Sequence, residues 1–204
     1  YDFIAHDESI LKIIHSERFN EIVINGFNIL KDVNKNGCYL DLGCNAGYLT
    51  SFYADYFKKS TIVGFDRCKK SIKYAKKNIN KNNNLYYFSQ IEKLKKYKFD
   101  YIFDTQCLSS ITKPQVLYKI LHSLHYSLSN KTKMISIANL NDEVEALTFF
   151  NNIGKFGFHI INISPLFFSS ILGKQAFTKI IFIREKQKYN YDIEKYFYVV
   201  RKKK

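Results

Sequence analysis

The sequence contains few prolines and glycines, and no segment is rich in either. Two prolines and eight glycines are spread over 204 residues, and no repeat of fixed period is present. Collagen-like and linker-like segments are therefore excluded, and a hydrophobic content of 46% is ample for a buried core. We expect a single domain over residues 1–204, with leading helices in 1–37 and a basic C-terminal tail in 185–204.

Long apolar runs and paired cysteines are also missing. No run approaches the roughly 18 to 20 apolar residues that a membrane-spanning helix needs, so we expect neither a signal peptide nor a membrane anchor. The cysteines form no C-x-x-C pair, which argues against a zinc site and a disulfide framework; they are Cys38, Cys44, Cys68 and Cys107. We expect reduced thiols, a cytoplasmic protein, no bound metal and no membrane partner.

Arginine is scarce, although the chain is strongly basic. The formal net charge is +14, and 32 residues are Lys or Arg, but arginine occurs only as Arg18, Arg67, Arg184 and Arg201. Basic side chains can neutralise the phosphates of nucleic acid, but phosphate recognition benefits from the bidentate guanidinium group that lysine lacks. The abundance of Lys, Asn, Ile, Tyr and Phe also fits a coding sequence biased toward A and T. The charge therefore leaves RNA binding and a compositional origin both open.

Hydrophobic patterning predicts strands that alternate with helices through the middle of the chain. In chain order we expect strand 38–42, helix 48–59, strand 61–66, helix 69–81, strand 85–89, a short helix or loop at 91–97, strand 99–104, helix 115–129, strand 134–138 and helix 141–153. Strands 158–164 and 177–184 follow with no long helix between them. That ending indicates an antiparallel pair beside an otherwise parallel sheet.

One turn between a predicted strand and a predicted helix is the segment most informative about function. From Asp41 to Tyr48 it reads D-L-G-C-N-A-G-Y. Glycines let the backbone approach a bound group closely, and the free amides at the following helix start favour an anionic or polar partner. Asp66 ends the next predicted strand, where an acid can accept hydrogen bonds from both hydroxyls of an adenosine ribose. The ligand should therefore contain a nucleoside.

The spacing of the glycines excludes the nicotinamide-binding fingerprint. That fingerprint requires G-x-G-x-x-G, whereas Gly43, Asn45 and Gly47 occupy alternate positions here. A carboxylate at Asp41 is a poor neighbour for a pyrophosphate but a good one for the ammonium group of an amino-acid moiety. Methionine supplies such a cation.

These segments resemble the class I S-adenosylmethionine-dependent methyltransferases, whose first motif has an acid followed by glycines at alternate positions. The resemblance extends over residues 40–184 and includes V-G-F-D ending at Asp66 and F-D-Y-I-F-D ending at Asp104. It implies a Rossmann-like three-layer α/β sandwich with a mostly parallel seven-stranded sheet and an antiparallel final strand. It also implies S-adenosylmethionine as methyl donor and S-adenosylhomocysteine as product.

The resemblance further implies which residues contact the cofactor. Asp41, Gly43 and Gly47 would border the methionine portion and Asp66 the ribose. The complete predicted set is Asp41, Gly43, Cys44, Asn45, Gly47, Tyr48, Asp66, Arg67, Gln90, Ile91 and Asp104.

Two positions depart from the family pattern. Asn45 stands where the middle glycine of the motif usually stands, and several subfamilies share that exchange. Gln90, which with Ile91 would lie near the adenine, follows Ser89 where many members have an acid. Its amide oxygen can still accept a hydrogen bond from the adenine amino group.

The catalytic residues are not identified by the sequence. An already nucleophilic acceptor needs no dedicated base, whereas an alcohol or phenol usually does. Asp104 either faces the active site or is an exposed carboxylate at a strand end. We expect the acceptor to contact residues 104–108 and 164–175, which should overhang the methyl group in this fold.

Three functions remain open at this point. Only about 37 residues precede the first motif strand, and macromolecular methyltransferases often carry added domains, so we favour a small-molecule acceptor. The positive charge keeps an RNA methyltransferase as the alternative. A catalytically silent partner subunit that retains the fold is the third possibility. The acceptor atom and the oligomeric state are not determined by the sequence.

Overall fold

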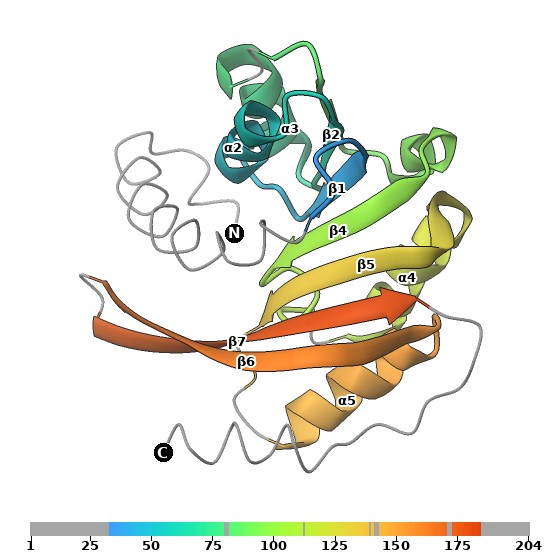
Figure 1. Ribbon diagram of the computed structural model, residues 1–204, viewed down its shortest axis with the longest axis vertical. Helices are drawn as coiled ribbons and strands as arrows, with labels where there is room; N and C mark the ends of the chain where they lie inside the picture. Colours follow the sequence, from blue (N-terminus) through green and yellow to red (C-terminus); the bar gives the residue numbers. More distant parts are fainter. Residues whose placement is uncertain are drawn as a thin grey trace. The chain divides into compact units, whose positions relative to one another are not determined.

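The computed structural model describes residues 33–79, 82–111, 113–138, 140, 143–170 and 173–184 (Figure 1). The helices expected before residue 33 and the basic tail expected at 185–204 lie outside the described residues. The chain divides into two compact units, a first unit of residues 1–93 and a second unit of residues 94–204. The expectation of one domain over residues 1–204 stays a prediction.

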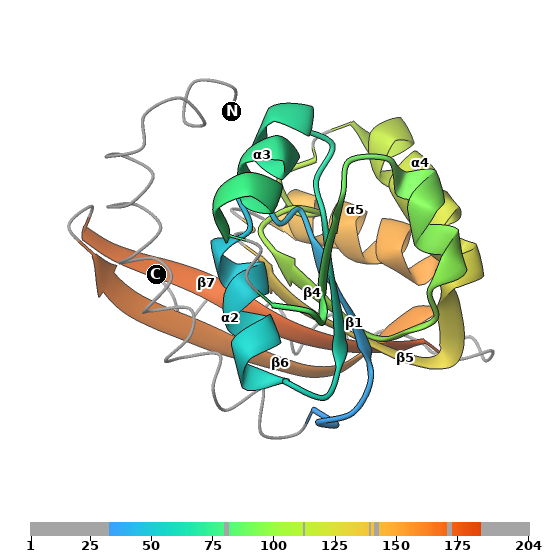
Figure 2. The same ribbon diagram turned by 90° about the horizontal axis from the view of Figure 1, so that it is seen from above.

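The first unit contains three parallel strands in the order β3-β2-β1. Their bounds are Cys38–Leu42 for β1, Thr61–Phe65 for β2 and Leu85–Phe88 for β3. Helix α2 (Tyr48–Tyr56) connects β1 to β2 and packs on β2 and β3. Helix α3 (Lys69–Tyr74) lies beside it in both views (Figures 1 and 2). These connections place every strand of the unit in the same direction, with the carboxyl ends at one edge.

Burial explains why the first unit's strands form where they do. Leu40, Ile62 and Val63 are completely buried, and each belongs to a short apolar run bounded by turn residues. Helix α2 ends at Tyr56, before the predicted end at residue 59. The helix after β2 continues from α3 into a π-helical turn, η2, at Ala75–Ile79. The strands and helices predicted from residue 38 to β3 are therefore confirmed, with a different end for α2.

The second unit contains four strands in the order β4-β5-β7-β6. The bounds are Phe99–Thr105 for β4, Leu128–Ala138 for β5, Phe158–Ser170 for β6 and Gly173–Arg184 for β7. β4 pairs in parallel with β5, and β7 runs antiparallel to both β5 and β6. The predicted antiparallel pair at the end of the chain is therefore confirmed.

Two helices of the second unit pack against each other. These are α4 (Pro114–Leu124), which starts one residue before the predicted start, and α5 (Glu143–Gly154). The buried residues of α4 are Leu117, Leu121 and Leu124, a spacing that places them on one face of the helix. A short 3-10 helix, η3 (Ile91–Lys96), precedes β4, and another, η4 (His125–Ser127), follows α4. Helix α5 contacts β6 and runs along it in Figure 1.

Two predicted boundaries in the second unit are wrong. Residues 128–129 begin β5 rather than ending a helix, and Leu128 pairs with Phe99. The connection expected at 164–175 is mostly strand, because β6 extends to Ser170 and β7 begins at Gly173. Pro165 lies within β6, which is the edge strand, and an edge position tolerates the missing amide hydrogen of proline.

The fold class predicted from the sequence is confirmed. The described residues contain seven strands interleaved with helices, and within the two units only the pairings of β7 are antiparallel. This mostly parallel seven-stranded pattern with an antiparallel final strand is that of a Rossmann-like α/β fold. Among the described residues, no helix has the length and apolar character that crossing a membrane requires.

Candidate functional site

The turn after β1, residues 43–47, has left-handed backbone conformations at alternate positions. The φ angles are 81° at Gly43, 48° at Asn45 and 85° at Gly47. Glycine adopts such angles without steric cost, and asparagine is among the few other residues that tolerate them. Asn45 therefore adopts a conformation that a glycine would also adopt at this position. We call residues 43–47 the glycine turn.

Backbone groups of the glycine turn are hydrogen-bonded to the end of β2. The amides of Gly43 and Cys44 donate to the Phe65 carbonyl at 2.8 and 3.0 Å. The amide of Asn45 donates to Asp66 Oδ2 at 3.0 Å. These bonds connect the carboxyl ends of the two strands, so that the first motif and the second predicted acid belong to one local structure.

Asp66 accepts one backbone hydrogen bond on each carboxylate oxygen. Besides Asn45, the amide of Cys68 donates to Asp66 Oδ1 at 2.8 Å. The side chain is half-buried. A carboxylate offers about four acceptor positions, so two of them remain for hydroxyl donors of a ligand. Asp66 therefore holds the glycine turn and retains the capacity that ribose binding requires.

Asp41 lies at the end of β1 and is only 2% exposed. The hydroxyl of Thr50, on α2, donates to Asp41 Oδ2 at 2.6 Å. Such short bonds to a carboxylate are stronger than bonds between neutral groups. The pair ties the strand to the helix that follows the glycine turn.

Tyr87, on β3, belongs to this site although the sequence analysis did not identify it. Its hydroxyl donates to the carbonyl oxygen of Gly47 at 2.8 Å, and its ring lies against two glycines. A Cβ atom would lie 2.5 Å from the Tyr87 hydroxyl at Gly47 and 2.6 Å from the ring at Gly64. Burial raises the pKa of Tyr87, with the neighbouring Cys44 and Asp41 acting in the same direction and a hydrogen bond with Thr50 opposing them.

The cross-strand pairing in the first unit gives the signal that could have identified Tyr87. Gly64 is the direct partner of Tyr87 in the β2–β3 register. A glycine inside a strand marks a close approach by another group, and an aromatic ring often covers such a glycine. The sequence shows both residues but not the register that pairs them.

The start of α2 carries backbone amides without a capping side chain. Gly47 is the N-cap residue, makes no side-chain cap bond, and is followed by a first turn that contains no acidic residue. Such amides, with the positive end of the helix dipole, favour an anionic ligand group. Tyr48 is the first residue of α2. Its hydroxyl lies 2.9 Å from the hydroxyl of Tyr74, the last residue of α3.

The remaining predicted contacts of the first unit lie beyond the same strand ends. Arg67 follows β2 and is exposed, whereas Gln90 and Ile91 follow β3, with Gln90 exposed and Ile91 half-buried. The structure thus gathers residues 41–48 and 66 through hydrogen bonds and places 67, 90 and 91 after the ends of the neighbouring strands. Their contacts with the cofactor stay predictions.

Asp104 lies in the second unit and is 1% exposed, so the possibility of an exposed carboxylate is wrong. Its Oδ1 accepts hydrogen bonds from the amides of Cys107 and Leu108, both at 3.0 Å, and its Oδ2 accepts one from the Ser136 hydroxyl at 2.6 Å. Burial raises the pKa of Asp104 to about 6, although these hydrogen bonds act in the opposite direction. Asp104 therefore holds the loop after β4.

Gln106, in the loop after β4, has a left-handed backbone conformation. Its φ angle is 61°, and its amide donates to the Ile137 carbonyl at 2.9 Å. A left-handed conformation at a residue other than glycine is costly, and such residues cluster at functional sites.

Within the described residues, no group of three or more His, Cys, Asp or Glu side chains could hold a metal ion.

Comparison with known protein families assigns the chain. A family model described as a methyltransferase domain matches residues 33–181. That range covers more than half of the 204 residues. Among proteins with curated descriptions, none matches the chain.

Solved methyltransferase structures share the fold at low sequence identity. A SAM-dependent methyltransferase from Methanosarcina mazei has a TM-score of 0.62 and 13% identity, and the match covers 78% of this chain and 98% of that one. Magnesium protoporphyrin IX methyltransferase from Synechocystis, solved with SAM, has a TM-score of 0.60, 16% identity and coverages of 85% and 83%. The N-methyltransferase NodS from Bradyrhizobium japonicum, solved with S-adenosyl-L-homocysteine, has a TM-score of 0.62, 13% identity and coverages of 82% and 87%. The chain therefore belongs to the methyltransferase domain family and is a class I S-adenosylmethionine-dependent methyltransferase.

Proposed function

We propose that this enzyme methylates a small molecule and that the first unit holds the S-adenosylmethionine. The observation that carries the proposed cofactor site is the glycine turn, which has left-handed residues at alternate positions. Three successive amides of this turn donate to the Phe65 carbonyl and to the Asp66 carboxylate. This turn leads directly into the uncapped start of α2. Hydrogen-bond donors and a carboxylate acceptor thus lie at one edge of the sheet, and a zwitterionic nucleoside requires both.

Each portion of the cofactor has a matching group in the first unit. The amides at the start of α2 suit the methionine carboxylate, and Asp41, Gly43 and Gly47 would border the methionine portion. Asp66 retains acceptor capacity for the ribose hydroxyls. Gln90 and Ile91, after β3, would lie near the adenine.

The chemistry depends on positioning more than on a dedicated catalytic group. S-adenosylmethionine supplies an electrophilic methyl group on a sulfonium, and the acceptor atom must approach it in line with the sulfur. Holding two reactants in such a geometry accounts for a large part of enzymatic acceleration. We propose that residues 105–108, which Asp104 holds through two amide hydrogen bonds, contact the acceptor.

The likeness to known structures supports a small acceptor. The matches with the magnesium protoporphyrin IX methyltransferase and with NodS cover more than four-fifths of this chain and of each of those chains. The first of these acts on a small molecule according to its name.

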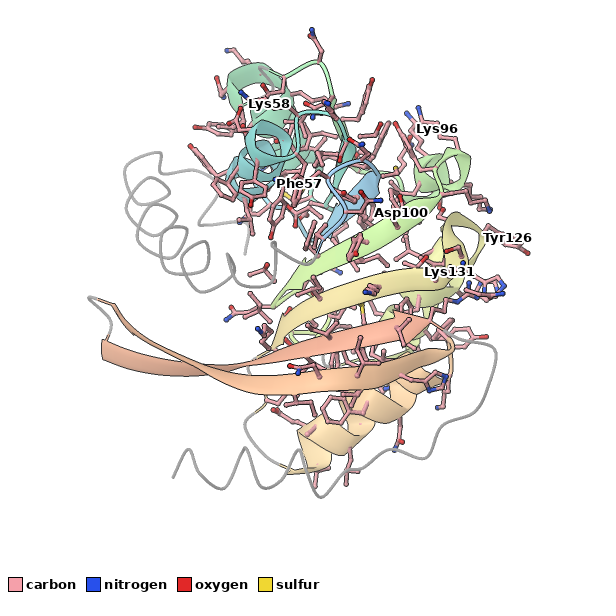
Figure 3. All side chains as sticks on the ribbon, in the orientation of Figure 1. Phe57, Lys58, Lys96, Asp100, Tyr126 and Lys131 are labelled. Carbon is pink, nitrogen blue, oxygen red and sulfur yellow. The ribbon has the colours of Figure 1, made fainter. Side chains whose placement is uncertain are left out.

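RNA is the second candidate acceptor, because one surface of the second unit favours it. Basic and aromatic side chains gather where β4 and β5 begin and β7 ends, a region in which Figure 3 labels Lys96, Tyr126 and Lys131. The Lys95 ammonium lies 5.5 Å from the ring centroid of Tyr126, which is 57% exposed. Lysines neutralise phosphates, and exposed rings can stack on bases. We call this the basic surface; it comprises Lys95, Lys98, His125, Tyr126, Lys131 and Arg184.

The arginine of the basic surface contacts the protein itself. Arg184 Nε donates to the Phe156 carbonyl at 3.2 Å, and its Nη2 lies 3.1 Å from His125 Nδ1. Burial lowers the pKa of Arg184. A guanidinium group that already serves these partners contributes less to phosphate recognition, so we favour the small acceptor over RNA.

We also propose that the enzyme works in the cytoplasm. Its four cysteines lack the spacing of a disulfide framework. Disulfide frameworks are typical of oxidising compartments and rare in the cytosol. This cysteine pattern supports the location, which fractionation of cells with an antibody against the chain would test.

Calorimetric titration with S-adenosylmethionine and S-adenosylhomocysteine tests the cofactor site. We expect saturable binding to the wild type and at least about tenfold weaker binding to Asp66→Ala, which corresponds to about 1.4 kcal/mol. Asp55→Ala is the matched control, because Asp55 is an exposed carboxylate on α2. No binding by a folded wild-type sample would overturn the proposed cofactor site. Equal weakening by both variants would overturn the role of Asp66.

A further inference from the structure

Tyr87 is a fully buried tyrosine whose ring is enclosed by glycines. It is 2% exposed, whereas its neighbour Tyr86, on the opposite face of β3, is 43% exposed. Gly64, on the adjacent strand β2, is its register partner, and Gly47 lies next to its hydroxyl. Any side chain at either glycine would collide with Tyr87, so the space for this ring depends on both glycines.

The carbonyl oxygen of Gly47 accepts two hydrogen bonds. The amide of Ser51 donates to it at 2.9 Å, which is the first helical bond of α2, and the hydroxyl of Tyr87 donates at 2.8 Å. Gly47 is at once the last residue of the glycine turn and the N-cap of α2. The position of this carbonyl therefore fixes how the turn joins the helix.

We propose that Tyr87 is a positioning residue for S-adenosylmethionine, acting through its hydroxyl on the Gly47 carbonyl to hold the glycine turn in its binding conformation. This inference rests on the proposed cofactor site. In this role Tyr87 would act on the cofactor through the Gly47 carbonyl, which accepts its hydroxyl. Its contribution is to preorganise the turn, which reduces the ordering that binding would otherwise require.

The hydroxyl of Tyr87, rather than its ring, carries this role. Phenylalanine would fill the same space beside Gly47 and Gly64, so packing alone does not require a tyrosine at this position. A buried hydroxyl is costly unless it is hydrogen-bonded, and its acceptor here is a backbone atom of the predicted cofactor site. Because burial raises the pKa of Tyr87, the phenol stays protonated and donates across the physiological pH range.

The test compares tyrosine-to-phenylalanine variants at three positions. Tyr87→Phe removes the hydroxyl and keeps the ring, so the protein should stay folded, as circular dichroism would verify. Tyr39→Phe makes the same change at a completely buried residue of β1, and Tyr86→Phe makes it at an exposed residue of β3. We expect the Kd for S-adenosylmethionine and S-adenosylhomocysteine to rise at least fivefold in Tyr87→Phe and to change less than twofold in both controls.

Amide hydrogen exchange provides a readout that does not depend on the cofactor. In the cofactor-free protein, the amides of Gly47 and Ser51, which donate to Cys44 and Gly47, report on the turn and on the first bond of α2. We expect both to exchange at least threefold faster in Tyr87→Phe, and at unchanged rates in Tyr39→Phe.

The outcomes separate this inference from the proposed cofactor site. A lower Tm for Tyr87→Phe with unchanged Kd and unchanged exchange at Gly47 would show a purely structural tyrosine and overturn the inference. Absence of binding by the wild type would instead overturn the cofactor site, whatever the variants do. Weaker binding by Tyr87→Phe together with faster exchange at Gly47 supports the inference.

Discussion

The Ser136 hydroxyl on β5 donates to Asp104 Oδ2 on β4 at 2.6 Å. The two residues are direct partners in the parallel register of these strands, so the bond crosses the sheet. The other carboxylate oxygen accepts the amides of Cys107 and Leu108. A single buried carboxylate thus joins two strands to the loop that we propose contacts the acceptor. Burying its charged form lowers the free energy of unfolding.

The first prediction concerns the pH dependence of stability. Burial raises the pKa of Asp104 from its ordinary value to about 6, so the folded protein binds this proton more tightly than the unfolded chain does. The free energy of unfolding should therefore fall as pH rises from about 4 to about 6, by about 3 kcal/mol in total from this group, and then level off. Urea unfolding of the wild type and of Asp104→Asn at pH 4.5, 5.5 and 7.5 measures this contribution, which the variant should lack.

Asp55→Asn is the control for this pH series. Asp55 is exposed on α2, and the substitution makes the same chemical change. It should keep the wild-type slope between pH 4.5 and 7.5. A wild-type slope that persists unchanged in Asp104→Asn would show that another group causes it.

A second prediction concerns the buried pair of Asp41 and Thr50. Thr50→Val keeps the shape of the side chain but removes the hydroxyl that donates to Asp41 Oδ2 at 2.6 Å. A buried carboxylate that loses a donor is destabilised, so we expect the free energy of unfolding to fall by about 1 to 3 kcal/mol. Urea denaturation at pH 7 measures the change. Thr50→Ser, which keeps the hydroxyl, should lose less than half as much, and equal losses in the two variants would contradict the role of the bond.

A third prediction concerns the glycine in β2. Gly64→Ala would place a Cβ atom 2.6 Å from the ring of Tyr87, and overpacking of this kind costs roughly 1 to 3 kcal/mol. Chemical denaturation should show that loss. In a Tyr87→Leu background the alanine should cost at least about 1 kcal/mol less, because the planar ring that it meets is gone. An identical cost in both backgrounds would show that Tyr87 is not what restricts position 64.

The fold was predictable from the sequence where apolar runs are bounded by turns. Residues 38–42 form β1 with the predicted bounds, and β2 ends one residue before Asp66. The length of β6 was not predictable, because Pro165 and the serines after it are typical of a loop. Their strand conformation depends on pairing with β7, and local sequence does not encode that contact.

Some residues of the candidate site could likewise be predicted from the sequence, and others could not. The glycine turn and Asp66 were predictable because their chemistry is contained in a few neighbouring residues at strand ends. Tyr87 was not, since its role depends on the register that pairs it with Gly64. The left-handed conformation of Gln106 was not predictable either, because a bond to Ile137 on the adjacent strand accompanies it.

The last prediction separates the two candidate acceptors by means of the basic surface. Lys95 and Lys131 are exposed on that surface, and Lys58 and Lys59 are exposed next to α2 in the first unit. A double alanine variant of either pair removes two positive charges. For a small-molecule enzyme, we expect both double variants to weaken binding of a fluorescent 12-nucleotide oligouridine by the same factor, within about twofold, because only net charge matters.

An RNA-binding surface would give a different pattern in the same fluorescence anisotropy titration at 100 mM salt. If phosphates bind to Lys95 and Lys131, the double alanine variant of that pair should lose at least tenfold more affinity for the oligouridine than the variant of Lys58 and Lys59. The reason is that the first variant removes contacts with phosphates and not only net charge. Tyr126→Ala, which changes no charge, would weaken binding as well, since base stacking on a ring contributes about 1 to 3 kcal/mol. Both effects together would overturn the preference for a small acceptor. Equal losses for the lysine pairs with no effect of Tyr126→Ala would instead identify the affinity for RNA as a consequence of the +14 net charge.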